Sequence, residues 1–131
     1  MNTTLDAPPN VAERDFSGVD RARVIAALSP LLPPGGLIYD TEDVRPYECD
    51  GLTAIRQLPM VVALPSTEAQ VVAILRTCSE LGVPVVARGA GTGLSGGALP
   101  HAHGVLLSLA KFNRIVSIDR LARTAVVQPG V

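Results

Sequence analysis

The chain has 131 residues, which gives room for one sizeable hydrophobic core and is too short for two domains of ordinary size. Hydrophobic residues make up 47% of it and charged residues 18%, so the composition argues against a disordered chain. Lys and Arg number 11 and Asp and Glu number 12. The net charge of -1 therefore leaves no basic excess to neutralise a phosphate backbone, which excludes nucleic acid as an expected partner.

The first 37 residues are expected to form a polar lead-in and one amphipathic helix. Residues 1–17 are polar and predict a flexible segment. Ser17 is the candidate N-cap of the helix, and the run 33–36, Pro-Pro-Gly-Gly, ends it. Apolar residues recur between these points at helical spacing: Val24, Ile25, Leu28, Leu31 and Leu32. Residues 37–58 show no sustained period and predict an irregular connection with short strand or turn pieces.

A strand, a helix and a second strand are predicted over residues 60–87. MVVAL at 60–64 is typical of a buried strand, and Thr67 with Gln70 fits a capping box. Gly82 stands where a left-handed residue would end the helix, and VPVVA follows as the second strand. The apolar face of the helix is predicted to consist of Val71, Ile74, Leu75, Cys78 and Leu81. Two apolar strands joined by one helix most simply form a right-handed parallel crossover.

Three further strands are predicted after residue 104: GVLLSL, RIVSI and TAVVQ, separated by the polar turns LAKFN and DRLAR. The sequence therefore predicts an α+β fold. The N-terminus lacks the basic and apolar regions of a signal peptide, and no apolar run approaches the ~18 residues of a membrane span. We expect a cytoplasmic protein without a transmembrane segment.

Glycine (12) and proline (11) are over-represented, and five of the glycines fall in the loop 88–97, RGAGTGLSGG, between two predicted strands. These are Gly89, Gly91, Gly93, Gly96 and Gly97. So many glycines predict positive φ angles or a ligand in contact with the backbone. Successive backbone N–H groups in such a loop can hold phosphate oxygens. Arg88 adds a positive charge, although a structural salt bridge is an equally available role for it, and Thr92 and Ser95 add hydroxyl donors.

Two common phosphate-binding motifs do not fit this loop. A Walker A motif needs a lysine at the position of Gly97. Gly91, Gly93 and Gly96 match a dinucleotide fingerprint, but that motif requires a helix directly after the glycines. GALPHAHG follows instead, and its glycines and proline oppose a helix. A loop between strands of an α+β flavin domain requires no such helix and remains compatible.

The run PVVARGAGTGLSGGALP at 84–100 resembles the diphosphate loop of the FAD-binding domain in the vanillyl-alcohol oxidase and p-cresol methylhydroxylase superfamily. More narrowly, YECDGLTA at 47–54 and VVQPGV at 126–131 look like the flavoprotein subunits of bacterial glycolate oxidases (glycolate dehydrogenases). The resemblance covers residues from about 38 to 131, and the lead-in and helix over 1–37 precede it. It implies the N-terminal part of an FAD-binding domain over 38–131, a βαβ subdomain plus the start of a second, because family members are several times longer.

The resemblance also implies which residues bind the cofactor. In the family, backbone amides of this loop hold the FAD diphosphate. That role falls on Arg88, Gly89, Ala90, Gly91, Thr92, Gly93, Leu94 and Ser95, with Gly96 and Gly97 shaping the exit. Relatives that attach FAD covalently carry a histidine where this chain has Thr92, so non-covalent FAD is expected. No catalytic residue can be carried over to this stretch of chain.

The implied function is a flavoprotein oxidoreductase that transfers a hydride from a small 2-hydroxy acid, with glycolate favoured, to FAD. Companion subunits with a second flavin and iron–sulfur clusters would take the electrons and provide any membrane association. The alternatives are a D-lactate or 2-hydroxyglutarate dehydrogenase of the same superfamily, or a non-catalytic nucleotide-binding or subunit-docking fragment. The 131 residues alone are not expected to turn over substrate.

The other chemistry-bearing residues predict no further site. Cys49 and Cys78 form no C-x-x-C pattern, so neither a zinc site nor a disulfide scaffold is indicated. His101 and His103 form an H-x-H pair with no third ligand apparent, and no metal is expected. The acidic residues of the irregular segment are interpreted as a solvated stretch: Glu42, Asp43, Glu48 and Asp50. Tyr47 and Asp50 would approach the cofactor only in the family's complete fold.

Overall fold

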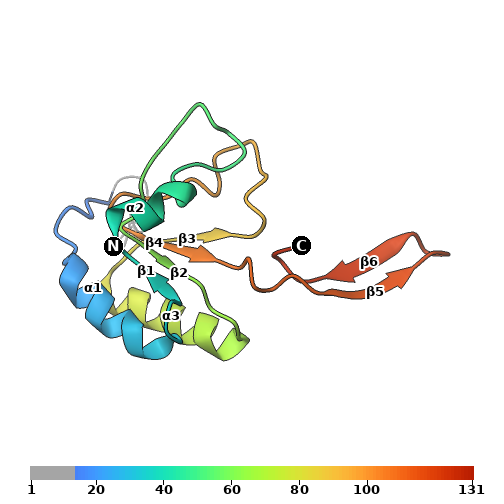
Figure 1. The fold of residues 1–131 in the computed structure, drawn as a ribbon, viewed down its shortest axis with the longest axis horizontal. Helices are drawn as coiled ribbons and strands as arrows, with labels where there is room; N and C mark the ends of the chain where they lie inside the picture. The colour runs from blue at the N-terminus through green and yellow to red at the C-terminus, as the bar shows by residue number, and fades with distance from the viewer. Residues whose placement is uncertain (1–13) are drawn as a thin grey trace, which may run out of the picture.

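The structure, a computed structural model, describes residues 14–131. Figure 1 shows two parts, a small sheet covered by helices and a two-stranded hairpin that projects from it. The flexible lead-in predicted over residues 1–17 falls mainly on residues 1–13, which lie outside the described part.

The sheet has four strands in the order β1-β2-β4-β3. The strands β2 (Val61–Ala63), β4 (Val105–Ser108) and β3 (Val85–Arg88) are parallel, and β1 (Leu37–Ile38) is antiparallel to β2. The prediction that the strands flanking the central helix run parallel is confirmed. These two strands are not neighbours, however, because β4 lies between them and pairs with both.

Both faces of the sheet are buried, and the alternation of side chains along each strand decides which layer they contact. Val61 and Ala63 of β2 pack in one core with α1 (Arg21–Leu28) and α3 (Glu68–Leu81). Val62, between them, points to the opposite face and packs with Val44 of the short helix α2 (Thr41–Val44) and with Leu106. The helices α1 and α3 therefore cover one face of the sheet, and α2 covers the other (Figure 1).

The central helix α3 has the termini that the sequence predicts. Thr67 accepts from the Gln70 N–H, and the Gln70 side chain accepts from the Thr67 N–H, which forms the capping box. Gly82 ends the helix with a left-handed φ of 65°. The prediction that Leu75 belongs to the buried face of this helix is wrong. Leu75 is 45% exposed, whereas Ile74 and Cys78 are buried.

The first helix begins later than predicted. The N-cap of α1 is Asp20, whose carboxylate accepts from the N–H groups of Ala22 and Arg23. The predicted cap Ser17 instead donates its N–H to Asp15. Asp and Ser are comparably good caps, so the apolar period alone could not choose between them.

The 3-10 helix η2 (Ser29–Leu31) follows α1, and a second one, η3 (Arg45–Tyr47), follows α2 in the segment predicted to be irregular.

The Cys78 thiol is expected to resist alkylation at pH 8. Burial against the sheet raises its pKa to about 11, so at this pH it stays protonated and out of reach of reagent. Cys49 is half-buried and is expected to react first. Mass spectrometry after iodoacetamide treatment should find the label on Cys49 alone in folded protein and on both cysteines in guanidinium. Equal labelling of the two in folded protein would contradict the described packing of α3.

The last two strands, β5 (Ile115–Asp119) and β6 (Thr124–Val127), are present as predicted, and the structure pairs them as an antiparallel hairpin. It projects from the sheet, and every residue of the two strands is exposed (Figure 1). Over residues 14–131, none of the helices has the length and apolar composition that crossing a bilayer requires.

Candidate cofactor site

The glycine loop, residues 88–97, leaves the sheet at the carboxyl end of β3 and returns to it at β4. It contains no helix, and none follows it before β4. The absence of the helix that the dinucleotide fingerprint needs was predicted from the residues after Gly97, and the structure confirms it. In Figure 1 the loop rises on the same side of the sheet as the segment that follows η3.

The backbone amides of the glycine loop are free. From residue 89 to residue 98, no N–H donates to an acceptor within residues 14–131. The first bond comes at the loop's exit, where the Leu99 N–H donates to the Gly96 carbonyl at 3.1 Å. Backbone N–H groups are strong donors that water or a ligand must satisfy when the chain does not. The loop therefore offers a row of donors suited to an anion.

The five glycines of the loop serve different purposes. Gly91 and Gly96 adopt left-handed φ angles of 75° and 76°, as predicted for such a loop. Gly89 lies against the carbonyl of Pro129, where a side chain would collide. Gly93 and Gly97 have neither a left-handed φ nor any neighbour within 4 Å of an added Cβ. Nothing in residues 14–131 requires glycine at these two positions, so their effect is to leave the backbone open to an incoming group.

The Arg88 side chain lies beneath the loop and points away from solvent. Arg88 is 7% exposed, and its guanidinium donates to the carbonyl of Ala98 at 2.8 Å and of Tyr47 at 3.2 Å. Burial lowers the pKa of this guanidinium, and the charge of nearby Asp50 opposes that shift. The sequence left two roles open for Arg88, a positive charge for a bound anion or a structural salt bridge. Arg88 forms no salt bridge within residues 14–131.

Residues 47–52, which we call the backing segment, lie directly against the glycine loop. A Cβ added to Gly51 would stand 2.7 Å from the carbonyl oxygens of both Thr92 and Gly93. Asp50 is 6% exposed, so the interpretation of this carboxylate as solvated is wrong. Its Oδ1 accepts from the Leu52 N–H at 2.8 Å, which fixes the turn that brings Gly51 to the loop. The YECDGLTA motif was the signal for this segment, but sequence reasoning assigned it no contact.

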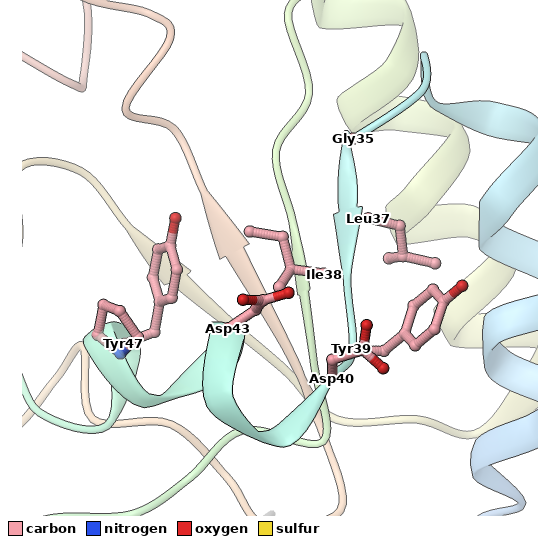
Figure 2. Close-up of a pocket in the computed structure, with 8 residues that line it drawn as sticks. Gly35, Leu37, Ile38, Tyr39, Asp40, Asp43 and Tyr47 are labelled. Atoms are coloured by element: carbon pink, nitrogen blue, oxygen red, sulfur yellow. The ribbon is translucent and has the colours of Figure 1, made fainter.

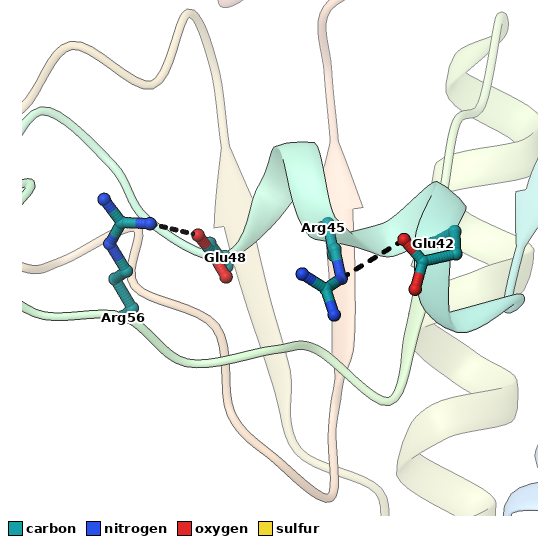
Figure 3. A network of polar contacts seen from close by, with 4 residues as sticks. All are labelled: Glu42, Arg45, Glu48 and Arg56. Carbon is teal, nitrogen blue, oxygen red and sulfur yellow. Dashed lines mark hydrogen bonds and ion pairs between the residues drawn. The ribbon is translucent and has the colours of Figure 1, made fainter.

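The other acidic residues of this region are exposed or paired at the surface, as Figure 3 shows. Glu42 contacts Arg45 at 3.4 Å, and both side chains are exposed. Glu48 contacts Arg56 at 2.7 Å, and the Glu48 carbonyl accepts from the Gln57 N–H at 2.7 Å. These two contacts of Glu48 close the base of the loop that carries the backing segment.

A pocket of about 490 Å³ lies between β1 and α2, and no residue of the glycine loop lines it (Figure 2). Its charged side chains are the carboxylates of Asp40 and Asp43, with Tyr39 and Tyr47 beside them. No cation lines it. A pocket with this charge repels a diphosphate, which leaves the glycine loop, with its free amides, as the better candidate for an anion site.

The histidines His101 and His103 contact each other and an aromatic side chain. The Nδ1 of His101 accepts from the His103 N–H at 3.1 Å, and the His101 ring packs edge-on against Phe16 at 5.3 Å. In the described part of the chain, no three side chains of ligand type gather into a group that could hold a metal.

A parallel sheet that carries a glycine-rich loop with free amides, open glycines and a buried cation beneath it defines a phosphate- or nucleotide-binding domain. Comparison with known proteins makes this class specific. Residues 59–131 match the family model described as "FAD binding domain", and the chain belongs to that family.

Named relatives and a solved structure agree with this assignment. The chain is 53% identical over 113 residues to glycolate oxidase subunit GlcD of Escherichia coli, covering 86% of this chain and 23% of that protein. It is 34% identical over 106 residues to the mitochondrial D-2-hydroxyglutarate dehydrogenase of Bos taurus, covering 81% and 19%. The crystal structure of p-cresol methylhydroxylase matches with a TM-score of 0.70 at 22% identity, covering 87% and 24%. The fold is therefore of the predicted p-cresol methylhydroxylase type, and the chain spans between about a fifth and a quarter of the length of these proteins.

Proposed function

We propose that the glycine loop binds the diphosphate of FAD in an FAD-dependent 2-hydroxy-acid oxidoreductase whose substrate is glycolate. The row of unpartnered amides over residues 89–98 is the observation that carries the proposal. The 53% identity to a glycolate oxidase subunit supports the choice of substrate. Residues 38–131 would then form the N-terminal part of the FAD-binding domain.

Four features of the glycine loop would contribute to binding the diphosphate: its amides, its hydroxyls, its open glycines and the charge of Arg88. Amides of residues 89–97 would donate to the diphosphate oxygens, and the exposed hydroxyls of Thr92 and Ser95 add donors at the same loop. Gly93 and Gly97 let the diphosphate approach the backbone. The buried charge of Arg88 makes the potential beneath the loop positive. FAD, when bound, supplies the hydride acceptor, and the protein holds it in place.

The cofactor is held without a covalent bond in this proposal. The glycine loop contains no histidine, cysteine or tyrosine that could attach to a flavin. The family resemblance supports the same proposal, because it implies that Thr92 stands where covalent relatives carry the linking histidine. Denaturation in trichloroacetic acid is expected to leave all flavin in the supernatant. Flavin that stays with the precipitated protein would overturn this part of the proposal.

The identity to a D-2-hydroxyglutarate dehydrogenase gives a second candidate substrate. The whole protein, purified with its flavin and kept free of oxygen, separates the two candidates. Bleaching of the visible flavin bands by glycolate supports the proposal, and bleaching by D-2-hydroxyglutarate alone supports the second candidate. A protein that binds no flavin, or whose flavin neither acid reduces, overturns both.

We further propose that companion flavin and iron–sulfur subunits accept the electrons in the cytoplasm and provide any attachment to a membrane.

Gly93→Ala is expected to weaken FAD binding by about tenfold without lowering the unfolding temperature of the apoprotein. The added methyl group meets nothing in residues 14–131, so only an approaching ligand would be obstructed. Titration of the apoprotein of the whole chain with FAD measures the dissociation constant. Gly18→Ala, which also adds a methyl group in open space but lies before α1, is the control. Equal affinities of the two variants would contradict the placement of the diphosphate.

A further inference from the structure

We infer that the backing segment, residues 47–52, and the side chain of Arg88 are positioning elements that hold the glycine loop in its binding conformation. Gly51, Leu52 and Arg88 act through the loop and need not touch FAD themselves. The inference rests on the proposed function, because it adds a second, distant part of the sequence to the same cofactor site.

The two ends of the glycine loop are joined by one side chain. Arg88 is the first residue of the loop, and Ala98 is the first residue after it. The hydrogen bond from the Arg88 guanidinium to the Ala98 carbonyl therefore connects both ends. Its second bond, to the Tyr47 carbonyl, fastens these ends to the backing segment. A loop whose ends are fixed loses less conformational entropy when it orders around a ligand.

The middle of the loop rests on the backing segment at two further places. Gly51 approaches the carbonyls of Thr92 and Gly93 so closely that no side chain fits between them. The Leu52 Cδ2 reaches 4.0 Å from the Cβ position of Gly96. With the Arg88 bonds, these contacts support the loop at its ends, centre and exit. The carbonyls of Thr92 and Gly93 are held against Gly51, which helps to fix the orientation of the loop's peptide groups.

Asp50 fixes the backing segment in turn. Its Oδ1 caps the Leu52 N–H, while its Oδ2 is buried without a partner in residues 14–131. The Nε of Arg88 is also buried and unpartnered there, and the two side chains carry opposite charges. The charge of Asp50 favours the charged form of the Arg88 guanidinium, and this attraction favours the arrangement in which both segments stay in contact. The YECDG residues thus have a physical role in a site whose glycines lie some 40 residues further along the chain.

The test is FAD titration of two variants of the backing segment in the whole protein. Gly51→Ala should displace Thr92 and Gly93 and raise the dissociation constant for FAD by about tenfold. Leu52→Ala removes the contact with Gly96 without a clash, and it keeps the inference testable if Gly51→Ala does not fold. We expect it to raise the constant about threefold. Gly18→Ala is the control and should bind as the unchanged protein does.

The readout separates positioning from a general loss of stability. A residue that only stabilises the fold would lower the unfolding temperature of the apoprotein and leave the FAD affinity of its folded fraction unchanged. For positioning residues that affinity itself falls, and higher FAD concentrations restore the flavin absorbance. Unchanged affinity in the folded variants, together with weakened binding in Gly93→Ala, overturns this inference alone. Unchanged affinity in Gly93→Ala as well overturns the proposed diphosphate site.

Discussion

Replacing Arg88 with methionine is expected to leave the whole protein largely without FAD and to lower its stability by about 3 kcal/mol. Methionine fills the buried volume but donates no hydrogen bond, so the carbonyls of Tyr47 and Ala98 lose their donor. The buried carboxylate of Asp50 would also lose its electrostatic attraction to the Arg88 guanidinium. The glycine loop would lose the connection between its ends.

Flavin content per chain and the midpoint of urea unfolding measure the two effects separately. Arg76→Met is the matched control, because Arg76 lies on the exposed side of α3 and is far from the loop in sequence. The control should change stability by less than about 0.5 kcal/mol and retain FAD. An Arg88→Met protein that purifies with a full complement of flavin would show that the loop does not depend on the buried guanidinium.

The second large effect is expected for Gly91→Val, which should abolish FAD retention. The backbone at Gly91 has a φ of 75°, where a β-branched residue is strained by about 1–3 kcal/mol. The added Cβ would also stand 3.2 Å from the Cδ of Arg88, so the branched side chain would press on the residue that joins the ends of the loop. Both effects move the row of amides out of its binding conformation.

Gly35→Val separates the loss of binding from backbone strain. Gly35 has a φ of 76° and precedes β1, outside the glycine loop and the backing segment. Its substitution carries a comparable backbone strain without a contact with Arg88, so both variants should lose stability while only Gly91→Val loses FAD. Visible absorption of the two purified proteins is sufficient as a measurement. Comparable flavin bands in both proteins would show that residues 88–97 do not hold the diphosphate.

These variants together test how the fold produces the site. The strand β3 places the start of the glycine loop at its carboxyl end, in a sheet that is buried on its two faces, and the Arg88 side chain bonds to Ala98 just after the loop's last residue. The strand and this bond constrain the two ends of the loop, while its own amides stay free for a ligand. In the proposed function, the site therefore depends on a loop that makes few backbone bonds of its own and is held by neighbouring segments.

Local signals predicted the elements that depend on neighbours in the chain. The capping box at Thr67 and the left-handed Gly82 were predicted correctly, because each depends on groups within one helical turn. The N-cap of α1 was placed at Ser17 in place of Asp20, since both residues can cap and the apolar period has no sharp start. Leu75 fits the apolar period of α3 but is exposed, because the core that packs against the helix covers Ile74 and Cys78 and leaves Leu75 outside it.

The sequence by itself determined the glycine loop, its lack of a following helix and the family that this loop indicates, because backbone freedom and helix propensity are properties of the local residues. Only the tertiary structure decided that β4 lies between β2 and β3 and that Arg88 turns inward to two carbonyls. It likewise decided that Asp50 is buried and that Gly51 supports the loop. Contacts between residues some 40 positions apart depend on how the chain packs, and no local pattern encodes that packing.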